Sequence, residues 1–118
     1  MTIANEIQQL HADMRQWRQH LHQCPETAFE ETQTAQFIAD KLTSFGLDVH
    51  QGLGKTGVVA TISAGNSEHK IALRADIDAL FIQEQNTVAY KSRHDGKMHA
   101  CGHDGHSAML LGAASYLS

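Results

Sequence analysis

The 118-residue sequence contains one proline and two cysteines, and it has no long hydrophobic run. Its N-terminus lacks the basic stretch and apolar core of a signal peptide, and no segment approaches the roughly 18 apolar residues that cross a bilayer. We therefore expect a cytoplasmic protein that does not enter a membrane. In that reducing compartment Cys24 and Cys101 should remain free thiols, because a lone cytosolic disulfide is uncommon.

Positive charge is also scarce in this sequence. Nine Lys and Arg residues stand against 13 Asp and Glu residues, which gives a formal net charge of -4 with neutral histidines. The basic residues are scattered and form no stripe that could follow a phosphate backbone. Nucleic-acid binding is therefore not expected, and the length suits one domain with a modest core.

Two amphipathic helices are predicted in the first half of the chain. Apolar residues recur at helical spacing over residues 3–21, and Pro25 bounds this helix because the residue before a proline avoids the α region. A second helix is expected to begin at Thr27, which forms a capping box with Glu30. Gly46 supplies the glycine that commonly ends a helix.

Short strands are predicted after these helices. Apolar and β-branched residues cover 47–49, 58–62 and 70–77, and turn residues between the last two runs suggest a hairpin or a short connection. The third run places its charged residues on one face: Arg74, Asp76 and Asp78. A strand that ends in charged residues on one side delivers them to an edge or a cleft.

Residues 78–102 show no sustained periodicity, and so long a loop in a compact domain is usually functional or disordered.

A final helix should begin between Asp104 and Ser107. Its apolar residues are Met109, Leu110, Ala113, Ala114 and Leu117. The order of helices, strands, loop and helix predicts an α/β layer architecture. The chain stops inside the last helix, so we expect it to be truncated.

Histidine is unusually abundant, with nine residues in the chain. Several fall close to Cys101 and His103, which are separated only by Gly102. Thiolate and imidazole are ligands of borderline ions such as zinc, and the glycine permits backbone angles that let the two side chains converge. Asp104 could cap the following helix or orient a ligand imidazole.

This short motif has a second interpretation. A histidine-rich loop can simply be solvated, and a Cys-x-His pair is a weak signal by itself. Two ligands also fall short of the three that a catalytic zinc site uses. Further ligands would have to come from elsewhere.

Longer motifs give the pair a context. Residues 74–80 (RADIDAL) followed by 98–112 (MHACGHDGHSAMLLG) resemble the M20 metallopeptidase family, in particular its aminoacylases, hippurate hydrolases and indole-acetyl-amino-acid hydrolases. Residues 18–22, 25–26 and 29–32 are similar to the N-terminal helix pair of the same family. The resemblance covers nearly the whole chain in the expected order. It implies the N-terminal part of a zinc-peptidase-like α/β catalytic domain.

By this resemblance Cys101 and His103 are ligands of a two-metal centre that holds zinc or manganese. The family hydrolyses the amide bond of N-acyl amino acids, with metals that polarise the carbonyl and activate a water. Asp76 matches an aspartate that supports a ligand histidine in related branches of the family. Arg74 stands two residues earlier in the same motif. His106 is expected in the cleft.

The resemblance also implies what residues 1–118 lack: the paired catalytic glutamates and the remaining histidine ligands of the family. Three carboxylates near the start of this chain are expected to serve helix starts and not catalysis: Glu26, Glu30 and Glu31. We therefore expect this chain alone to be inactive on its N-acyl amino acid substrate.

Two functions remain open from the sequence. The first is a metal-dependent amidohydrolase, with the activity belonging to a complete protein. The second is a truncated, non-catalytic chain that self-associates and binds metal weakly, since exposed sheet edges and an incomplete core favour homo-oligomers. A redox module is disfavoured because the sequence has no C-x-x-C motif.

Overall fold

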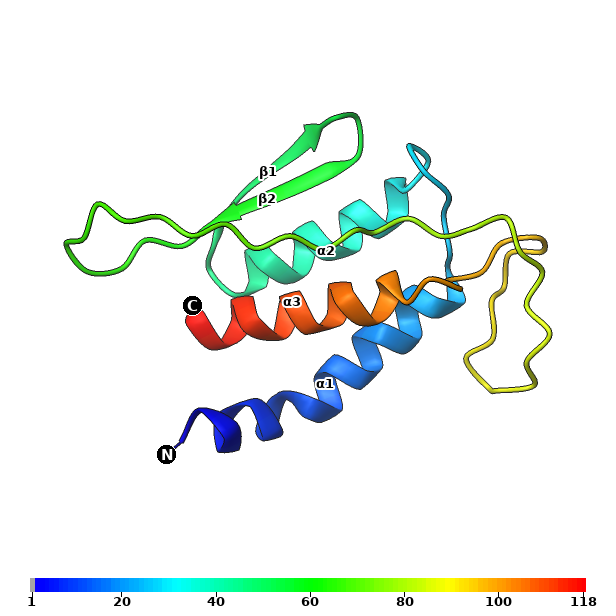
Figure 1. Ribbon diagram of the computed structural model, residues 1–118, viewed down its shortest axis with the longest axis horizontal. Helices are drawn as coiled ribbons and strands as arrows, with labels where there is room; N and C mark the ends of the chain where they lie inside the picture. The colour runs from blue at the N-terminus through cyan, green and yellow to red at the C-terminus, as the bar shows by residue number, and fades with distance from the viewer. Residues whose placement is uncertain (1) are drawn as a thin grey trace.

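The computed structural model describes residues 2–118, in which three helices and one β-hairpin are connected by a long irregular segment (Figure 1). The elements are α1 (Ile3–Gln23), α2 (Thr32–Ser44), β1 (Asp48–Leu53), β2 (Gly57–Thr61) and α3 (His103–Leu117). The predicted α/β class and the order of helices, strands, loop and helix are confirmed. Both ends of the described chain lie at the same end of the molecule (Figure 1).

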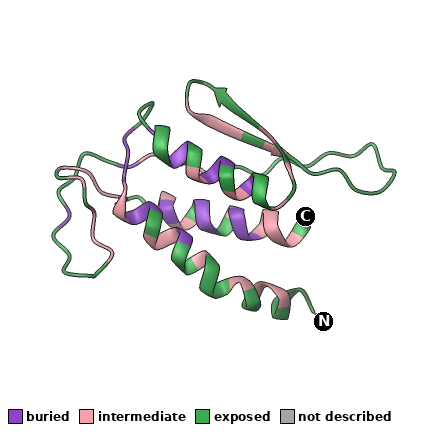
Figure 2. Cartoon of the chain, turned by 180° about the vertical axis from the view of Figure 1, so that it is seen from behind, coloured by how far each residue is buried: buried purple, intermediate pink, exposed green. Residues whose placement is uncertain are grey.

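Helix α1 follows its predicted apolar stripe, but only its second half is buried (Figure 2). Thr2 caps the helix by accepting a hydrogen bond from the Asn5 amide at 3.3 Å. Trp17 and Leu21 are buried, whereas Ile3 at the start of the same stripe is exposed. The buried half of α1 packs against α3, which places the end of α1 beside the predicted metal motif.

Helix α2 begins at Thr32 and not at Thr27, so the predicted capping box is wrong. Thr27 instead forms an isolated parallel bridge with Ala79. Phe29 has a φ of 65°, a left-handed conformation that cannot continue a right-handed helix. The segment between α1 and α2 is therefore not helical, and it pairs with the start of the long loop through the bridge between Thr27 and Ala79.

The carboxylate of Glu26 caps α2 from outside the helix. It accepts hydrogen bonds from the amides of Gln33 at 3.2 Å and Thr34 at 2.6 Å. These are two of the donors that a helix start leaves unpaired. Glu31, the residue before the helix, instead accepts a hydrogen bond from the Thr56 hydroxyl at 2.7 Å. Glu26 thus serves a helix start, as the sequence suggested, whereas the Glu31 side chain does not cap the helix and instead joins it to the turn of the hairpin.

The sheet consists of β1 and β2 alone within the described chain, paired antiparallel with an irregularity between Gln51 and Leu53. Their turn uses positive φ at Gly54 and Lys55. Both strands pack on α2. The predicted runs 47–49 and 58–62 correspond to these two strands.

The third predicted strand, residues 70–77, is not a strand in this structure. Ile71 is 89% exposed, and only the end of the run is half-buried, where Ile77 packs against the core. A β-strand requires a hydrogen-bonded neighbour, and no strand of residues 2–118 pairs with this run. Figure 1 shows it as an irregular trace that returns from the loop after β2 and crosses in front of α2 in this view.

The hydrophobic core lies where the three helices meet. Its buried members are Trp17, Ile38, Leu42, Ala108 and Leu111. The predicted apolar face of α3 is wrong in part, because Met109 and Leu117 are exposed while Ala108 and Leu111 are buried. Helix α3 is apolar on most sides, so its sequence does not select the face that meets α1 and α2.

The long loop is ordered by backbone contacts with the end of α1. Leu80 and Met98 exchange two hydrogen bonds of 3.0 Å across its base. The Arg93 amide donates to the Gln23 carbonyl at 2.9 Å, and His94 Nδ1 donates to the Pro25 carbonyl at 2.8 Å.

Within residues 2–118, no helix has the length and apolar character needed to cross a membrane.

Candidate metal centre

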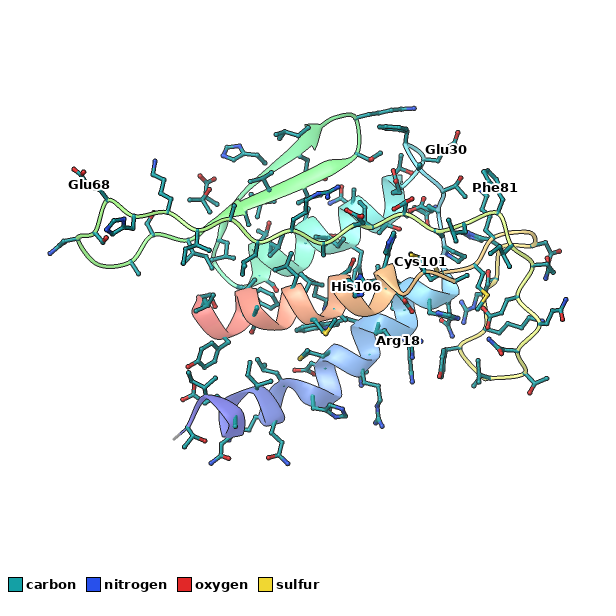
Figure 3. All side chains as sticks on the ribbon, in the orientation of Figure 1. Arg18, Glu30, Glu68, Phe81, Cys101 and His106 are labelled. Carbon is teal, nitrogen blue, oxygen red and sulfur yellow. The ribbon has the colours of Figure 1, made fainter. Side chains whose placement is uncertain are left out.

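Cys101 and His103 flank the first residue of the turn into α3. Gly102 is the N-cap residue and has a φ of 88°, a conformation that favours glycine. The Cys101 side chain is exposed, and it lies with His106 near the start of α3 (Figure 3). The His103 side chain is 15% exposed. The glycine between the two predicted ligands therefore has the backbone role that the sequence indicated.

The His103 ring is held by Asp78. Nδ1 lies 2.8 Å from the Asp78 backbone carbonyl and 3.0 Å from its Oδ1. A carbonyl oxygen can only accept, so Nδ1 carries a proton, and in the neutral ring Nε2 therefore keeps its lone pair. This is how proteins prepare a histidine for metal binding through its other nitrogen. The sequence placed Asp78 on the charged face of its run but gave it no such role.

Asp76 and Arg74 pair with each other. The Arg74 guanidinium lies 2.7 Å from Asp76 Oδ1; the Arg74 side chain is largely exposed to solvent, and the Asp76 side chain is partly buried. The backbone carbonyl of Asp76 accepts a hydrogen bond from the Ser107 hydroxyl of α3 at 3.3 Å. The hydrogen bonds of the His103 ring thus go to Asp78, two residues further along the chain than Asp76.

His106 lies one helical turn after His103, with 5.9 Å between the ring centroids. It is exposed and lines an open hollow of about 360 Å³. The other lining residues are Leu73, Arg74, Ala75, Met109, Leu110 and Ala113. The cleft role that the sequence suggested for His106 stays a prediction.

Asp104 is buried and is not the cap of α3, because Gly102 holds that position. Its Oδ2 accepts hydrogen bonds from Arg18 Nε at 3.0 Å and His22 Nδ1 at 2.8 Å. Burial alone would raise the pKa of Asp104. The hydrogen bonds from His22 and the Gly105 amide, with the charges of His99 and Arg18, outweigh burial and hold it below 3.8.

Glu84 is a buried carboxylate that the sequence analysis missed. Its Oε1 lies 3.0 Å from His22 Nε2 and accepts the Ser92 amide at 2.9 Å. Its Oε2 accepts from the Asn86 side chain at 3.2 Å. Burial raises the pKa of Glu84, but these hydrogen bonds and the charge of His22 bring it below 4.5. Glu84 lies in the long loop, whose sequence has no helical or strand periodicity, so nothing in the sequence indicates that this residue is buried.

His99 is 5% exposed, and neither ring nitrogen has a hydrogen-bond partner among residues 2–118. Burial lowers the pKa of His99, against the opposing charge of Asp104. A buried imidazole therefore lies close to the candidate ligands.

The donor chemistry fits a borderline divalent ion, but the set is incomplete. Cys101 offers a thiol and His103 offers Nε2, which are ligand types of zinc. No group of three His, Cys, Asp or Glu side chains in the described part of the chain is arranged to hold a metal. Residues 2–118 can therefore supply two ligands, and a full site needs others.

Comparisons with known proteins identify the family that this chain resembles. Residues 72–118 match Peptidase family M20/M25/M40. The chain is 48% identical over 118 residues to the hippurate hydrolase of Campylobacter jejuni, covering 100% of this chain and 31% of that protein. It is 46% identical over 116 residues to the N-acyl-L-amino acid amidohydrolase of Geobacillus stearothermophilus, covering 98% and 31%.

The fold comparison also covers most of the chain. A Bacillus subtilis protein described as a dinuclear metal binding peptidase from the M20 family matches with a TM-score of 0.86 and 40% identity, over 92% of this chain and 30% of that one. A putative aminohydrolase from methicillin-resistant Staphylococcus aureus matches with a TM-score of 0.85 and 38% identity, over 89% and 28%. The chain thus spans about a third of the length of these proteins. In sequence and in fold it matches the M20 peptidase family.

Proposed function

We propose that this chain contributes part of the site of a metal-dependent amidohydrolase, which in a complete protein cleaves the amide bond of N-acyl amino acids. The observation that carries the proposal is the His103 ring. Asp78 binds its Nδ1 and leaves Nε2 free, and only Gly102 separates this residue from Cys101 with its exposed thiol. The relatives named for hydrolysis of hippurate and of N-acyl-L-amino acids supply the substrate class.

The chain's own residues have defined tasks in this proposal. Cys101 and His103 would hold divalent metal, zinc or manganese, in a two-metal centre. Bound metal there would polarise the amide carbonyl and provide a hydroxide-like water. Asp78 fixes the His103 tautomer.

A second candidate is a non-catalytic chain that binds metal weakly and self-associates. The observation in its favour is the incomplete ligand set of residues 2–118. We expect the 118-residue chain alone to leave N-acyl amino acids intact. The amidohydrolase proposal applies to a protein that supplies the remaining ligands.

A chimeric enzyme tests the proposal. This chain would replace the 118 matching residues of the Campylobacter jejuni hippurate hydrolase, with which it shares 48% identity. We expect the chimera to release glycine from N-benzoylglycine and to lose that activity on chelation. Cys101→Ala and His103→Ala should each cost more than the roughly 10–100-fold that loss of a supporting hydrogen bond costs a metal site.

Lys55→Gln, in the exposed hairpin turn, is the matched control and should leave the rate unchanged. Turnover that survives both Cys101→Ala and His103→Ala would contradict the proposal. A folded, metal-loaded chimera without turnover would favour the non-catalytic chain.

A further inference from the structure

His22 occupies an unusual position at the end of α1. Its side chain is buried, with the residue 3% exposed, and each ring nitrogen meets a different buried carboxylate. Nδ1 lies 2.8 Å from Asp104 Oδ2, and Nε2 lies 3.0 Å from Glu84 Oε1. Those carboxylates come from α3 and from the long loop, so one imidazole connects three segments that are far apart in sequence.

The two contacts constrain the protons on the ring. Ionised carboxylates only accept hydrogen bonds, and a neutral imidazole has only one N–H to donate. Both contacts are satisfied together when the ring carries two protons. A charged imidazole between two carboxylates also makes stronger hydrogen bonds than a neutral one.

The surroundings balance this charge and limit access of water. Arg18 adds a second positive charge on Asp104 at 3.0 Å, so two cations face two anions. Tyr90 places its ring edge-on to the His22 ring, with centroids 5.6 Å apart, and its face under the Arg18 guanidinium at 5.4 Å. Buried charges persist in proteins when they are paired and hydrogen-bonded in this way.

These contacts form a cluster next to the candidate ligands, with the members Arg18, His22, Glu84, Tyr90 and Asp104. Asp104 follows His103 in the first turn of α3, so its side chain faces α1 while the His103 ring faces Asp78. Fixing Asp104 fixes the rotation of this turn. The His103 ring reaches Asp78 only if that rotation is held.

We propose that His22 is a positioning residue for the metal centre: as an imidazolium bound to Asp104 and Glu84, it sets the first turn of α3 and thereby aims His103 Nε2. The proposal rests on the proposed function, in which His103 is a ligand. Its effect passes through Asp104, because Asp104 belongs to α3 whereas Glu84 belongs to the long loop.

Nuclear magnetic resonance of the 118-residue chain, with ¹⁵N-labelled histidine and without metal, tests the proton count first. At neutral pH both ring nitrogens of His22 should carry protons, while His103 should be protonated on Nδ1 alone. A bare nitrogen on His22 would overturn the proposal. This measurement needs no variant and no hydrolysis, so its failure is separate from failure of the proposed function.

Two amide substitutions then separate the two contacts. The side-chain nitrogen of asparagine lies near the Nδ1 position and that of glutamine near the Nε2 position. His22→Asn should therefore keep the contact with Asp104, and His22→Gln should keep the contact with Glu84. We expect the His103 spectrum and zinc affinity to survive His22→Asn, and to change in His22→Gln with a loss of about tenfold or more in affinity.

The controls address loss of stability. Leu42→Ala removes a core side chain far from His103 in sequence, and it should lower stability without changing the His103 tautomer. His20→Gln substitutes the other histidine of the same turn, whose ring stacks on Phe37, and should have no effect. Equal His103 spectra in His22→Asn and His22→Gln, or a changed tautomer in Leu42→Ala, would contradict a positioning role.

Discussion

The His103 imidazole shows how a single contact can prepare a side chain for metal. Its Nδ1 proton is committed to Asp78, so Nε2 is the only ring nitrogen that remains to bind an ion. Spacing in the sequence was enough to find Cys101, Gly102 and His103, because all three lie within one turn of the chain. Asp78 lies 25 residues earlier, and only the folded chain reveals their contact.

Asp78→Ala should weaken zinc binding by the 118-residue chain. The substitution removes Oδ1 but keeps the backbone carbonyl that also accepts from Nδ1, so we expect a loss near the lower end of the 10–100-fold range, about tenfold. Asp76→Ala is the matched control, because Asp76 pairs with the exposed Arg74. Calorimetric titration measures both, and equal affinities in the two variants would argue against the support by Asp78.

Glu84 gives the protein an acid-sensitive contact. Its pKa is below the ordinary 4.5, so the unfolded chain takes up this proton first as the pH falls. The stabilisation is complete above about pH 4.5 and is lost as the pH drops through the lower pKa of the folded state. Glu84→Gln should lower the free energy of unfolding by about 1–3 kcal/mol at pH 7. The difference in this free energy between the variant and the wild type should shrink below about pH 4.5.

Urea unfolding from pH 3 to pH 7 provides the measurement. Glu68→Gln serves as the control, since Glu68 is exposed in the loop after β2 (Figure 3). A constant difference between Glu84→Gln and the wild type across this range would show that the carboxylate contributes no ionised contact.

Among the elements, the sequence predicted helices better than their contacts. Residues 3–21 gave α1 because a long stripe with helical spacing admits one interpretation. The start of α2 was missed because the carboxylate that caps it, Glu26, lies outside the helix. The run 70–77 has the composition of a strand, but composition cannot provide the neighbour that a strand needs.

Helix α3 provides the clearest test of which face is buried. Leu111→Ala should lower the free energy of unfolding by about 2–5 kcal/mol, because Leu111 is in the core. Met109→Ala should stay within about 0.5 kcal/mol, because Met109 is 56% exposed. Thermal and urea unfolding of both variants check this, and the reverse order would restore the face that the sequence suggested.

The molecule as a whole leaves apolar surface uncovered. Ile71, Leu73 and Phe81 are exposed, and the run 70–77 has no strand partner among residues 2–118. Such surfaces favour association. The sequence predicted exposed sheet edges and an incomplete core, but no sequence pattern identifies what covers the surface.

We therefore expect the isolated chain to self-associate. Sedimentation velocity should show a sedimentation coefficient that rises with concentration, and Ile71→Lys with Leu73→Lys should reduce the rise. Lys55→Gln, in the hairpin turn, should not change it. A single monomeric species at high concentration would contradict this expectation.

The central claim is that this chain carries two ligands of a metal centre, and calorimetric titration of the purified chain with zinc and with manganese tests it most directly. We predict weak binding that is lost in both Cys101→Ala and His103→Ala and is kept in His106→Ala. Unchanged affinity in Cys101→Ala and His103→Ala would show that the ligands lie elsewhere.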